Sequence, residues 1–515
     1  MLVIPKETNP ARAVLTHRGL HTLTSQPNSK RCLATSTQGA RKEGNISSVF
    51  VSLSGKEKFA LPGRFADQKK RLIAGREDQI QQSWDRLLRK LKDEVHLIEQ
   101  RGSDIVPSID FKDIQSAPAA FTNELRKRGV AVIRGVIPEH EARGYKEEIE
   151  HYAKVNPGTK AFPPHDPQVY ELYWSKPQMH ARTHPNMLEA QRFLMSFWKS
   201  DAPDAMISPT HPLIYADRLR IRQPGDAGFA LGPHVDGGSC ERWEDNGYGR
   251  GDVYKNIFEG NWEQYDPWEA SCRVPAEADL YNGAGACSMF RMFQAWLSMS
   301  HSGPNEGTLL VNPLLSMATA YFLLRPFFEP IYLPPKDCSR MALHTFLDPS
   351  NWRLEKETSS RLQGAAPGYA QELSTALHPH LELDKTMVHV PKIAPGDYVA
   401  WHCDTIHAVN KVHNGSGDSS VMYIPACPVT EANAAYVARQ KNDFVAGVPP
   451  PDFPGGKGES KHVGRATEGG LRALTNELGL RAFGFGKWDV NKGALSHGQR
   501  QVLEKANQIL SVSYN

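Results

Sequence analysis

Along residues 66–101 the apolar side chains recur mostly at intervals of three and four, and charged side chains fill the positions between them. That period places the apolar positions on one face of an α-helix. We therefore expect a long amphipathic helix from Ala66 to about Arg101 that packs against a core and has a structural role.

A helix–strand–helix unit is predicted next. Ala119–Arg128 has a helical pattern that Gly129 ends, and Val130–Val136 is a short apolar strand. Pro138 then opens a helix over Glu139–Val155, because proline at a first helical turn with acidic residues beside it is a typical start signal.

Between Tyr215 and Pro425 the pattern changes to short apolar stretches separated by Gly, Pro, Asn and Asp. Stretches of this length without helical periods between them favour a double-sheet jelly roll. After Pro428 a helical pattern returns over Glu431–Phe444, and again near residues 470–480 and 497–510. The strand-like stretches are Leu219–Ile221, Met289–Met299, Thr308–Val311, Met387–Val390, Tyr398–Trp401 and Val421–Ile424.

These elements predict an α+β protein with a double-stranded β-helix core (jelly roll, cupin-like) and helical decoration at both ends. Residues 1–48 are basic, rich in Ser and Thr and poor in acidic residues. Such a start is typical of a disordered tail, which we expect to contact the core little, or of a mitochondrial transit peptide. We expect a cytoplasmic protein, with mitochondria as the alternative. The predicted parts are a tail over 1–48, a helical extension over 49–110, the jelly-roll domain with flanking helices over 111–485, and a C-terminal helical segment over 486–515.

Charge and cysteine content exclude several classes of partner and site. Lys plus Arg number 60 against 57 Asp plus Glu, so a net charge of +3 provides no electrostatic argument for nucleic acid. No apolar run approaches the roughly 20 residues of a membrane-spanning helix. The seven cysteines are far apart and include no C-x-x-C pair, which argues against a disulfide framework or a cysteine zinc site.

The sharpest local motif is His234-Val235-Asp236, which Gly232-Pro233 precedes and Gly237-Gly238 follows. Residues two apart in a strand project from the same face. His-x-Asp therefore presents an imidazole and a carboxylate side by side, which is two-thirds of the 2-His-1-carboxylate triad of non-haem iron(II) oxygenases. By itself the motif is common, and each histidine would more often be a buried, hydrogen-bonded core residue.

The second histidine must come from a distant strand. Pro395-Gly396-Asp397 has the composition of a tight turn, and an apolar strand follows it. Three histidines after that turn are candidates for the third ligand, namely His402, His407 and His413. The spacing of the residues alone leaves the three open.

The order of these motifs resembles the phytanoyl-CoA-hydroxylase-like branch of the iron(II)/2-oxoglutarate oxygenases. H-x-D is followed after roughly 170 residues by G-D-x-x-x-W-H-x-x-x-x-H, which spans Gly396 to His407. The resemblance implies that the last histidine, His407, is the ligand and that His402 supports it from the strand. It therefore implies an iron(II) site formed by His234, Asp236 and His407.

A closer resemblance, from about residue 110 to about 485, is to the YbiU-like proteins, a family known as a domain of unknown function. The matching stretches are Glu171–Gln178, Tyr215–Gly225, the His234 segment through Trp243, Phe290–Ser298, the His402–His407 stretch and Ser419–Pro425.

The resemblance also implies 2-oxoglutarate as co-substrate, whose far carboxylate needs a cation, best an arginine with its planar fork. The related enzymes place this arginine 10 to 14 residues after the distal histidine, where this chain has Gly417–Val421 and no arginine. Arg218, Arg220 and Arg222 alternate along one strand and share a face. We expect Arg220 to be the cation, before Arg218 and then Arg291. The other expected cofactor-binding residues are Gln294, Thr308 and Ser420.

The expected function is an iron(II)- and 2-oxoglutarate-dependent oxygenase that oxidises an unactivated C–H bond of a small molecule with O2, assayed with ascorbate. Hydroxylation is the default outcome, with desaturation or cyclisation as variants. The alternative is a cupin-like metal-binding protein without turnover of 2-oxoglutarate, or a cofactor-independent dioxygenase. The absence of arginine from residues 417–421 is the main support for that alternative.

Overall fold

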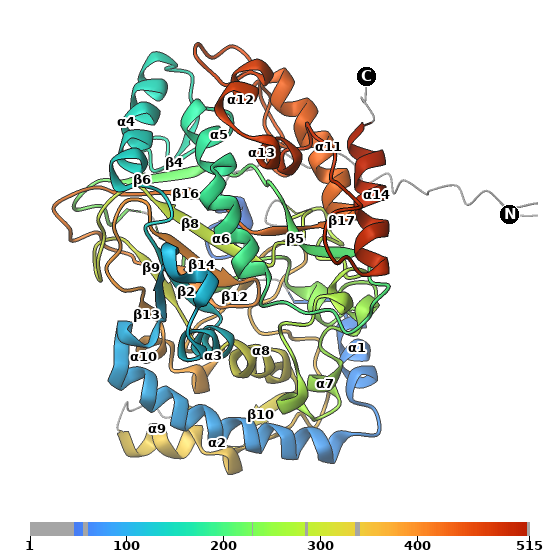
Figure 1. Ribbon diagram of the computed structural model, residues 1–515. Helices are drawn as coiled ribbons and strands as arrows, with labels where there is room; N and C mark the ends of the chain where they lie inside the picture. The colour runs from blue at the N-terminus through green and yellow to red at the C-terminus, as the bar shows by residue number, and fades with distance from the viewer. Residues whose placement is uncertain (1–45, 55–59, 229, 284–286, 335–339, 512–515) are drawn as a thin grey trace, which may run out of the picture. The chain divides into compact units, whose positions relative to one another are not determined.

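The computed structural model of the chain describes residues 46–54, 60–228, 230–283, 287–334 and 340–511. These residues form a mixed α/β protein with several sheets (Figure 1). The helices are α1 Arg64–Ile73, α2 Glu77–Arg101, α3 Ala119–Arg128, α4 Glu139–Val155, α5 Lys176–Thr183, α6 Pro185–Met195, α7 Lys255–Phe258, α8 Leu315–Leu324, α9 Arg340–Leu347, α10 Leu383–Thr386, α11 Glu431–Ala446, α12 Glu468–Leu474, α13 Glu477–Ala482 and α14 His497–Ser511.

The larger of the two main sheets has eight strands in the order β1-β2-β14-β8-β16-β6-β4-β3, antiparallel except for the β1–β2 pair. Side chains alternate between its faces: Ala295 and Leu297 of β8 join one apolar cluster, whereas Trp296 joins another. One face therefore packs against helices such as α4 and α6, and the other faces the smaller sheet. The strands are β1 Ser108–Asp110, β2 Val130–Arg134, β3 Ala161–Phe162, β4 Val169–Tyr170, β6 Leu219–Arg222, β8 Phe293–Ser298, β14 Tyr398–His402 and β16 Ser419–Tyr423.

The smaller sheet has five strands in the order β12-β7-β15-β9-β13, and its central pairing sets His407 of β15 opposite His234 of β7. Two further pairs of strands, β5 with β17 and β10 with β11, lie outside the main sheets. These strands are β5 Ile207–Leu213, β7 His234–Val235, β9 Leu309–Val311, β10 Phe328–Pro330, β11 Trp352–Leu354, β12 Gln371–Glu372, β13 Val388–His389, β15 His407–Val409 and β17 Cys427–Thr430.

The helices expected from amphipathic periods are present. The predicted helices 119–128 and 139–155 coincide with α3 and α4, and the terminal helix expected near 497–510 is α14. The long helix expected over 66–101 is interrupted, because Gly75 adopts a positive φ of 74° between α1 and α2. α2 then runs along α8 and α10 (Figure 1) and buries its apolar stripe there.

The expectation of strands without helices between Tyr215 and Pro425 is wrong, since α7 to α10 fall in that range. The cause is clearest in α8, where residues 318–324 are all buried. A helix that is apolar on every side has no polar face and therefore no amphipathic period for a sequence pattern to reveal.

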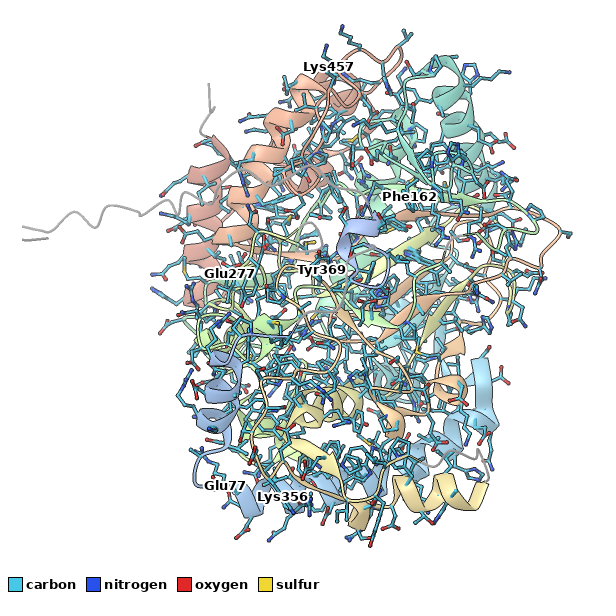
Figure 2. The ribbon with its side chains drawn as sticks, turned by 180° about the vertical axis from the view of Figure 1, so that it is seen from behind. Glu77, Phe162, Glu277, Lys356, Tyr369 and Lys457 are labelled. Carbon is cyan, nitrogen blue, oxygen red and sulfur yellow. The ribbon has the colours of Figure 1, made fainter. Side chains whose placement is uncertain are left out.

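The predicted tail over residues 1–48 lies outside the described residues up to residue 45. Its last three residues belong to a 3-10 turn, Ile46–Val49, whose Val49 is buried with Phe50 and Ala370. Ala370 N donates to Val49 O at 3.0 Å, beside the segment that carries Tyr369 (Figure 2). Within residues 46–48, Ile46 packs against this cluster, and the expectation of few contacts stays a prediction for the rest of the tail. None of the described helices combines the length and apolar character that crossing a membrane requires.

Candidate metal centre

The side chains of His234, Asp236 and His407 converge at one point. One ligand-type atom from each lies within 4.8 Å of the others. Asp236 Oδ1 is 3.6 Å from His234 Nε2, and its Oδ2 is 3.8 Å from His407 Nε2. β7 and β15 produce this arrangement because their antiparallel register sets the two histidines opposite each other, and Asp236 follows β7 directly.

Main-chain carbonyls orient both imidazoles. His234 Nδ1 lies 2.7 Å from Gly232 O, and His407 Nδ1 lies 3.1 Å from Thr405 O. A carbonyl oxygen only accepts, so each Nδ1 carries the proton and donates, which leaves the Nε2 lone pair free. Both lone pairs therefore point toward the Asp236 carboxylate, as in metal-binding histidines whose second nitrogen is hydrogen-bonded.

The electrostatics at His407 and Asp236 suit a cation. Burial, with His234 nearby, lowers the pKa of His407 to about 3, so its imidazole is neutral at pH 7. Burial alone would raise the pKa of Asp236, but His234, His407 and Arg291 outweigh it and hold that pKa below its usual value. Two imidazole nitrogens and one carboxylate form the donor set that iron(II) takes in a facial triad, so the residues fit such a metal.

A tight turn after Asp236 requires glycine. Gly238 has a φ of 79°, and a Cβ atom there would lie 2.5 Å from Ala278 O. Any other residue would displace this turn, because both the backbone conformation and the space exclude a side chain. The Gly237-Gly238 pair of the motif thus allows the tight backbone turn that follows Asp236.

The other histidines of the second motif are structural. His402 Nε2 donates to Pro267 O at 2.9 Å, and its Nδ1 accepts from Asp404 N at 3.0 Å, so neither nitrogen is available to a metal. His413 is likewise occupied on both sides, by Gly417 O and Gly415 N. Of the three candidates only His407 reaches the triad.

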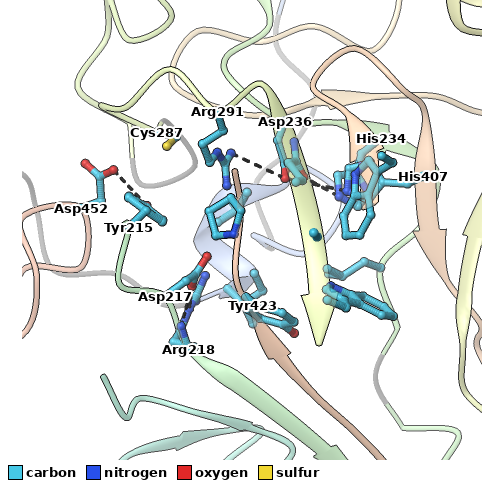
Figure 3. Close-up of a pocket in the computed structure, with 18 of the residues that line it drawn as sticks. Tyr215, Asp217, Arg218, His234, Asp236, Cys287, Arg291, His407, Tyr423 and Asp452 are labelled. Carbon is cyan, nitrogen blue, oxygen red and sulfur yellow. Dashed lines mark hydrogen bonds and ion pairs between the residues drawn. The ribbon is translucent and has the colours of Figure 1, made fainter. Parts of the chain in front are cut away.

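A cavity opens at the triad, here termed the metal-site cavity, and side chains from both main sheets line it (Figure 3). Gln294 and Arg218, both expected near the cofactor, are among its lining residues. Arg291, expected with lower priority, reaches toward Asp236, with Nη2 3.9 Å from Oδ2. The other lining residues are Ile46, Val49, Phe50, Tyr215, Asp217, Leu231, Cys287, Ala295, Trp296, Trp401, Val409, Tyr423, Pro425, Asp452 and Phe453.

Three expected cofactor-binding residues do not line this cavity. Arg220 is buried in β6 and its Nη2 donates to Gln168 Oε1 at 2.8 Å. Ser420 pairs with Ile221 on the opposite face of the large sheet, and its hydroxyl donates to Asp418. Thr308 is buried just before β9, away from the lining. The structure thus brings Arg218 and Arg291, rather than Arg220, to the cavity.

The Ile46–Val49 turn and Phe50 close one side of the metal-site cavity. The Phe50 ring is only 4% exposed and meets the His234 ring edge-on at 4.8 Å. This segment is also hydrogen-bonded to β12, since Ser52 N donates to Glu372 Oε2 at 3.1 Å. The sequence does not reveal this wall, because the apolar run around Val49 and Phe50 is too short to indicate where it packs.

Phe50→Ala should lower the free energy of unfolding by about 2 kcal/mol, the value for burying one large apolar side chain. Urea unfolding of the full chain measures this. Leu53→Ala, at a half-buried position of the same segment, is the matched control and should cost less than half as much. Equal stability of Phe50→Ala and the unchanged protein would contradict the packing of this segment at the site.

Behind the triad lies a buried ionic cluster formed by Arg242, Asp404 and Arg273. Asp404 Oδ1 accepts from Arg242 Nη1 at 3.0 Å, and Oδ2 accepts from Arg273 Nη2. Arg242 Nη2 also donates to Asp236 O at 2.7 Å. The cluster therefore connects the turn before His407 to the main chain of the Asp236 ligand, and no local sequence pattern indicates it, since Arg242 and Asp404 lie 162 residues apart.

Comparisons with known proteins agree over most of the chain. A family model described as Gig2-like matches residues 59–485. Uncharacterized protein YbiU of Escherichia coli strain K12 is 34% identical over 406 residues, which are 76% of this chain and 88% of YbiU. The crystal structure of GlcNAc Inducible Gene 2 of Candida albicans superposes with a TM-score of 0.77 at 30% identity, covering 89% of this chain and 97% of the other. Hypothetical protein JW0805 of Escherichia coli superposes with a TM-score of 0.68 at 33% identity, covering 83% of this chain and 99% of the other.

Proposed function

The chain belongs to the Gig2-like family, and from the geometry of its triad we propose that it is an iron(II)- and 2-oxoglutarate-dependent oxygenase. The observation that carries the proposal is the convergence of His234, Asp236 and His407, with both imidazole Nδ1 atoms tied to carbonyls and both Nε2 lone pairs free. A purely structural cluster of three such residues would use these lone pairs in hydrogen bonds, as His402 does.

The proposed core is a double-stranded β-helix, within the wider superfamily of such oxygenases. Its support is the arrangement of the two main sheets around one cavity. Trp296, Trp401 and Tyr423 of the eight-stranded sheet and His234 and His407 of the five-stranded sheet line the same space. A site between two sheets places its side chains on regular strands, which hold them more rigidly than loops do.

In this proposal His234, Asp236 and His407 hold iron(II). When bound, the metal and 2-oxoglutarate would supply oxidation of an unactivated C–H bond by O2, with succinate and CO2 as co-products. Arg218 lines the same cavity and is the cation we assign to the far carboxylate of 2-oxoglutarate. Its Nε donates to Asp217 Oδ1 at 3.2 Å, which orients the guanidinium. Tyr423 and Phe453 add an aromatic surface beside it.

The direct test is a reaction under air with iron(II), 2-oxoglutarate and ascorbate, in which released succinate is measured. The expected result is succinate release that requires iron(II) and is absent in the Asp236→Ala variant, because removing the carboxylate leaves two ligands. Asp217→Asn, which keeps the triad, should retain iron and release succinate at a raised apparent KM for 2-oxoglutarate. Bound iron without any succinate release would instead favour a metal-binding protein without turnover.

A further inference from the structure

A second cavity meets the metal-site cavity at the triad. The two share four lining residues, namely Asp236, Cys287, Arg291 and Gln294, whereas the two histidines line only the first. A ligand in the second cavity would therefore approach the proposed metal from the side of Asp236. Its other lining residues are Gly237, Tyr248, Arg273, Val274, Ala276, Glu277, Ala278, Ser288, Met289, Phe290, Cys403, Thr430, Ala432 and Asn433.

Two polar side chains at this junction have unused hydrogen-bonding groups. The side chain of Arg291 is only 13% exposed, and its closest carboxylate, Asp236, is 3.9 Å away, too far for a hydrogen bond. Gln294 is 5% exposed. Neither the guanidinium of Arg291 nor the amide of Gln294 has a hydrogen-bond partner among the described residues. Buried polar groups are nearly always paired, so a charged group in this state indicates a place for a ligand.

The other arginines near the cavities differ from Arg291. Arg218, which lines the metal-site cavity, donates from Nε to Asp217 Oδ1 at 3.2 Å, and Arg273, which lines the second cavity, donates to Asp404. These guanidinium groups are therefore held by the protein itself. Arg291 instead has the distant Asp236 carboxylate at 3.9 Å and the Tyr215 ring, whose centre is 5.7 Å from the guanidinium.

Arg291 lies too close to the proposed metal ligands to bind the far carboxylate of 2-oxoglutarate. A dicarboxylate that binds the metal through its first carboxylate and keto group extends its far carboxylate several bonds away. Arg291 lies instead beside Asp236, a proposed metal ligand, and on the border of both cavities. We propose that Arg291 and Gln294 bind the carboxylate of the substrate that the enzyme oxidises, a small carboxylic acid in the second cavity. This inference rests on the proposed function.

The chemistry of the pair supports a carboxylate. The planar guanidinium presents two parallel N–H groups that match two carboxylate oxygens, and the amide of Gln294 adds one more donor. Carboxylate recognition beside the metal would place the carbon atoms near that carboxylate closest to the site of oxidation. Met289 and Phe290 offer apolar surface for the remainder of a small substrate.

The test measures binding of straight-chain monocarboxylates of two to six carbons and of their primary amides by calorimetry, without air. Binding is measured in the metal-free protein and in the protein saturated with iron(II) and 2-oxoglutarate. We expect at least one acid to bind at least about 10-fold tighter than its amide in both states. Arg291→Gln should weaken binding of that acid by about 30-fold or more, as truncation of one partner of a buried charge pair does. Binding of the amide should be unchanged. Gln294→Leu should weaken the acid less.

Arg218→Gln is the matched control, since Arg218 lines only the metal-site cavity. It should weaken binding of 2-oxoglutarate and leave the preference for the acid over its amide unchanged. Loss of acid binding on saturation with 2-oxoglutarate would assign Arg291 to the co-substrate and overturn the proposal. So would equal binding of acids and amides throughout the series. Because binding to the metal-free protein needs no turnover, a failure of the oxygenase assay would leave this result readable.

Discussion

His407→Ala is expected to leave the protein folded and to remove its capacity for iron(II). The His407 Nε2 atom faces Asp236 in the cavity, so the fold loses the Nδ1 bond to Thr405 O and the ring contacts with Trp401 and His234. One hydrogen bond contributes about 1 kcal/mol to stability. Losing a direct ligand should weaken iron(II) binding by more than about 100-fold, which is the upper end of the effect of losing an outer-shell partner. Iron per chain after anaerobic loading and gel filtration, together with urea unfolding, measures both effects.

His402→Ala is the matched control, and its effects should be the reverse. The His402 ring stacks on the Trp198 ring with 4.6 Å between the ring centroids, and both its nitrogens are hydrogen-bonded. Its removal should therefore cost stability, about 2 kcal/mol or more, while about one iron per chain is retained. Full iron loading of His407→Ala, or loss of iron from a folded His402→Ala, would contradict the assignment of the ligands.

The local parts of the fold were predictable because their patterns are periodic. The charged and apolar positions of α3, α4 and α14 follow the helical repeat. The strand period likewise predicted that His234 and Asp236 would project together, although β7 ends at Val235. α5 and α6 were not predicted, and their starts are marked by side-chain caps, since Ser175 accepts from Gln178 N and His184 accepts from Asn186 N.

The long-range parts were not predictable from spacing. Alternation correctly places Arg218, Arg220 and Arg222 opposite the apolar Leu219 and Ile221. It does not reveal which guanidinium reaches a cavity, because that depends on partners far away in sequence. Gln168 holds Arg220, Asp226 holds Arg222, and Arg218 reaches the metal-site cavity.

The same reasoning applies to the cluster behind the triad, where Arg242 and Asp404 lie 162 residues apart. Asp404→Asn should lower the free energy of unfolding by about 3 to 5 kcal/mol, the cost of breaking a buried ion pair by removing one partner. Asparagine keeps the shape but leaves the charges of Arg242 and Arg273 without their carboxylate, at side-chain exposures of 0% and 3%. Urea unfolding at pH 7 measures the change.

The exposed pair of Lys199 and Asp201 offers a matched control, with side-chain exposures of 52% and 70%. Asp201→Asn should change stability by less than about 1 kcal/mol, since solvent screens such pairs. The effect of Asp404→Asn should also depend on pH. Burial opposes ionisation of Asp404, but Arg273 and Arg242 outweigh it and hold its pKa far below the usual range. The carboxylate therefore stabilises the fold fully above the unfolded pKa of about 3.9, and the difference between variant and unchanged protein should shrink as the pH falls below it.

Asp404→Asn should act on the metal as well as on the fold, because Arg242 also donates to the main-chain oxygen of Asp236. With its carboxylate partner gone, Arg242 no longer holds that ligand in place. Iron(II) affinity of the folded variant should fall about 10- to 100-fold, as for other outer-shell partners. Tyr265→Phe removes the hydrogen bonds that the Tyr265 hydroxyl makes with Asp404 and Arg273 and no charge, so it should cost about 2 kcal/mol and little iron affinity. An Asp404→Asn protein that unfolds at the same urea concentration and binds iron(II) as tightly as the unchanged protein would show that the cluster positions nothing.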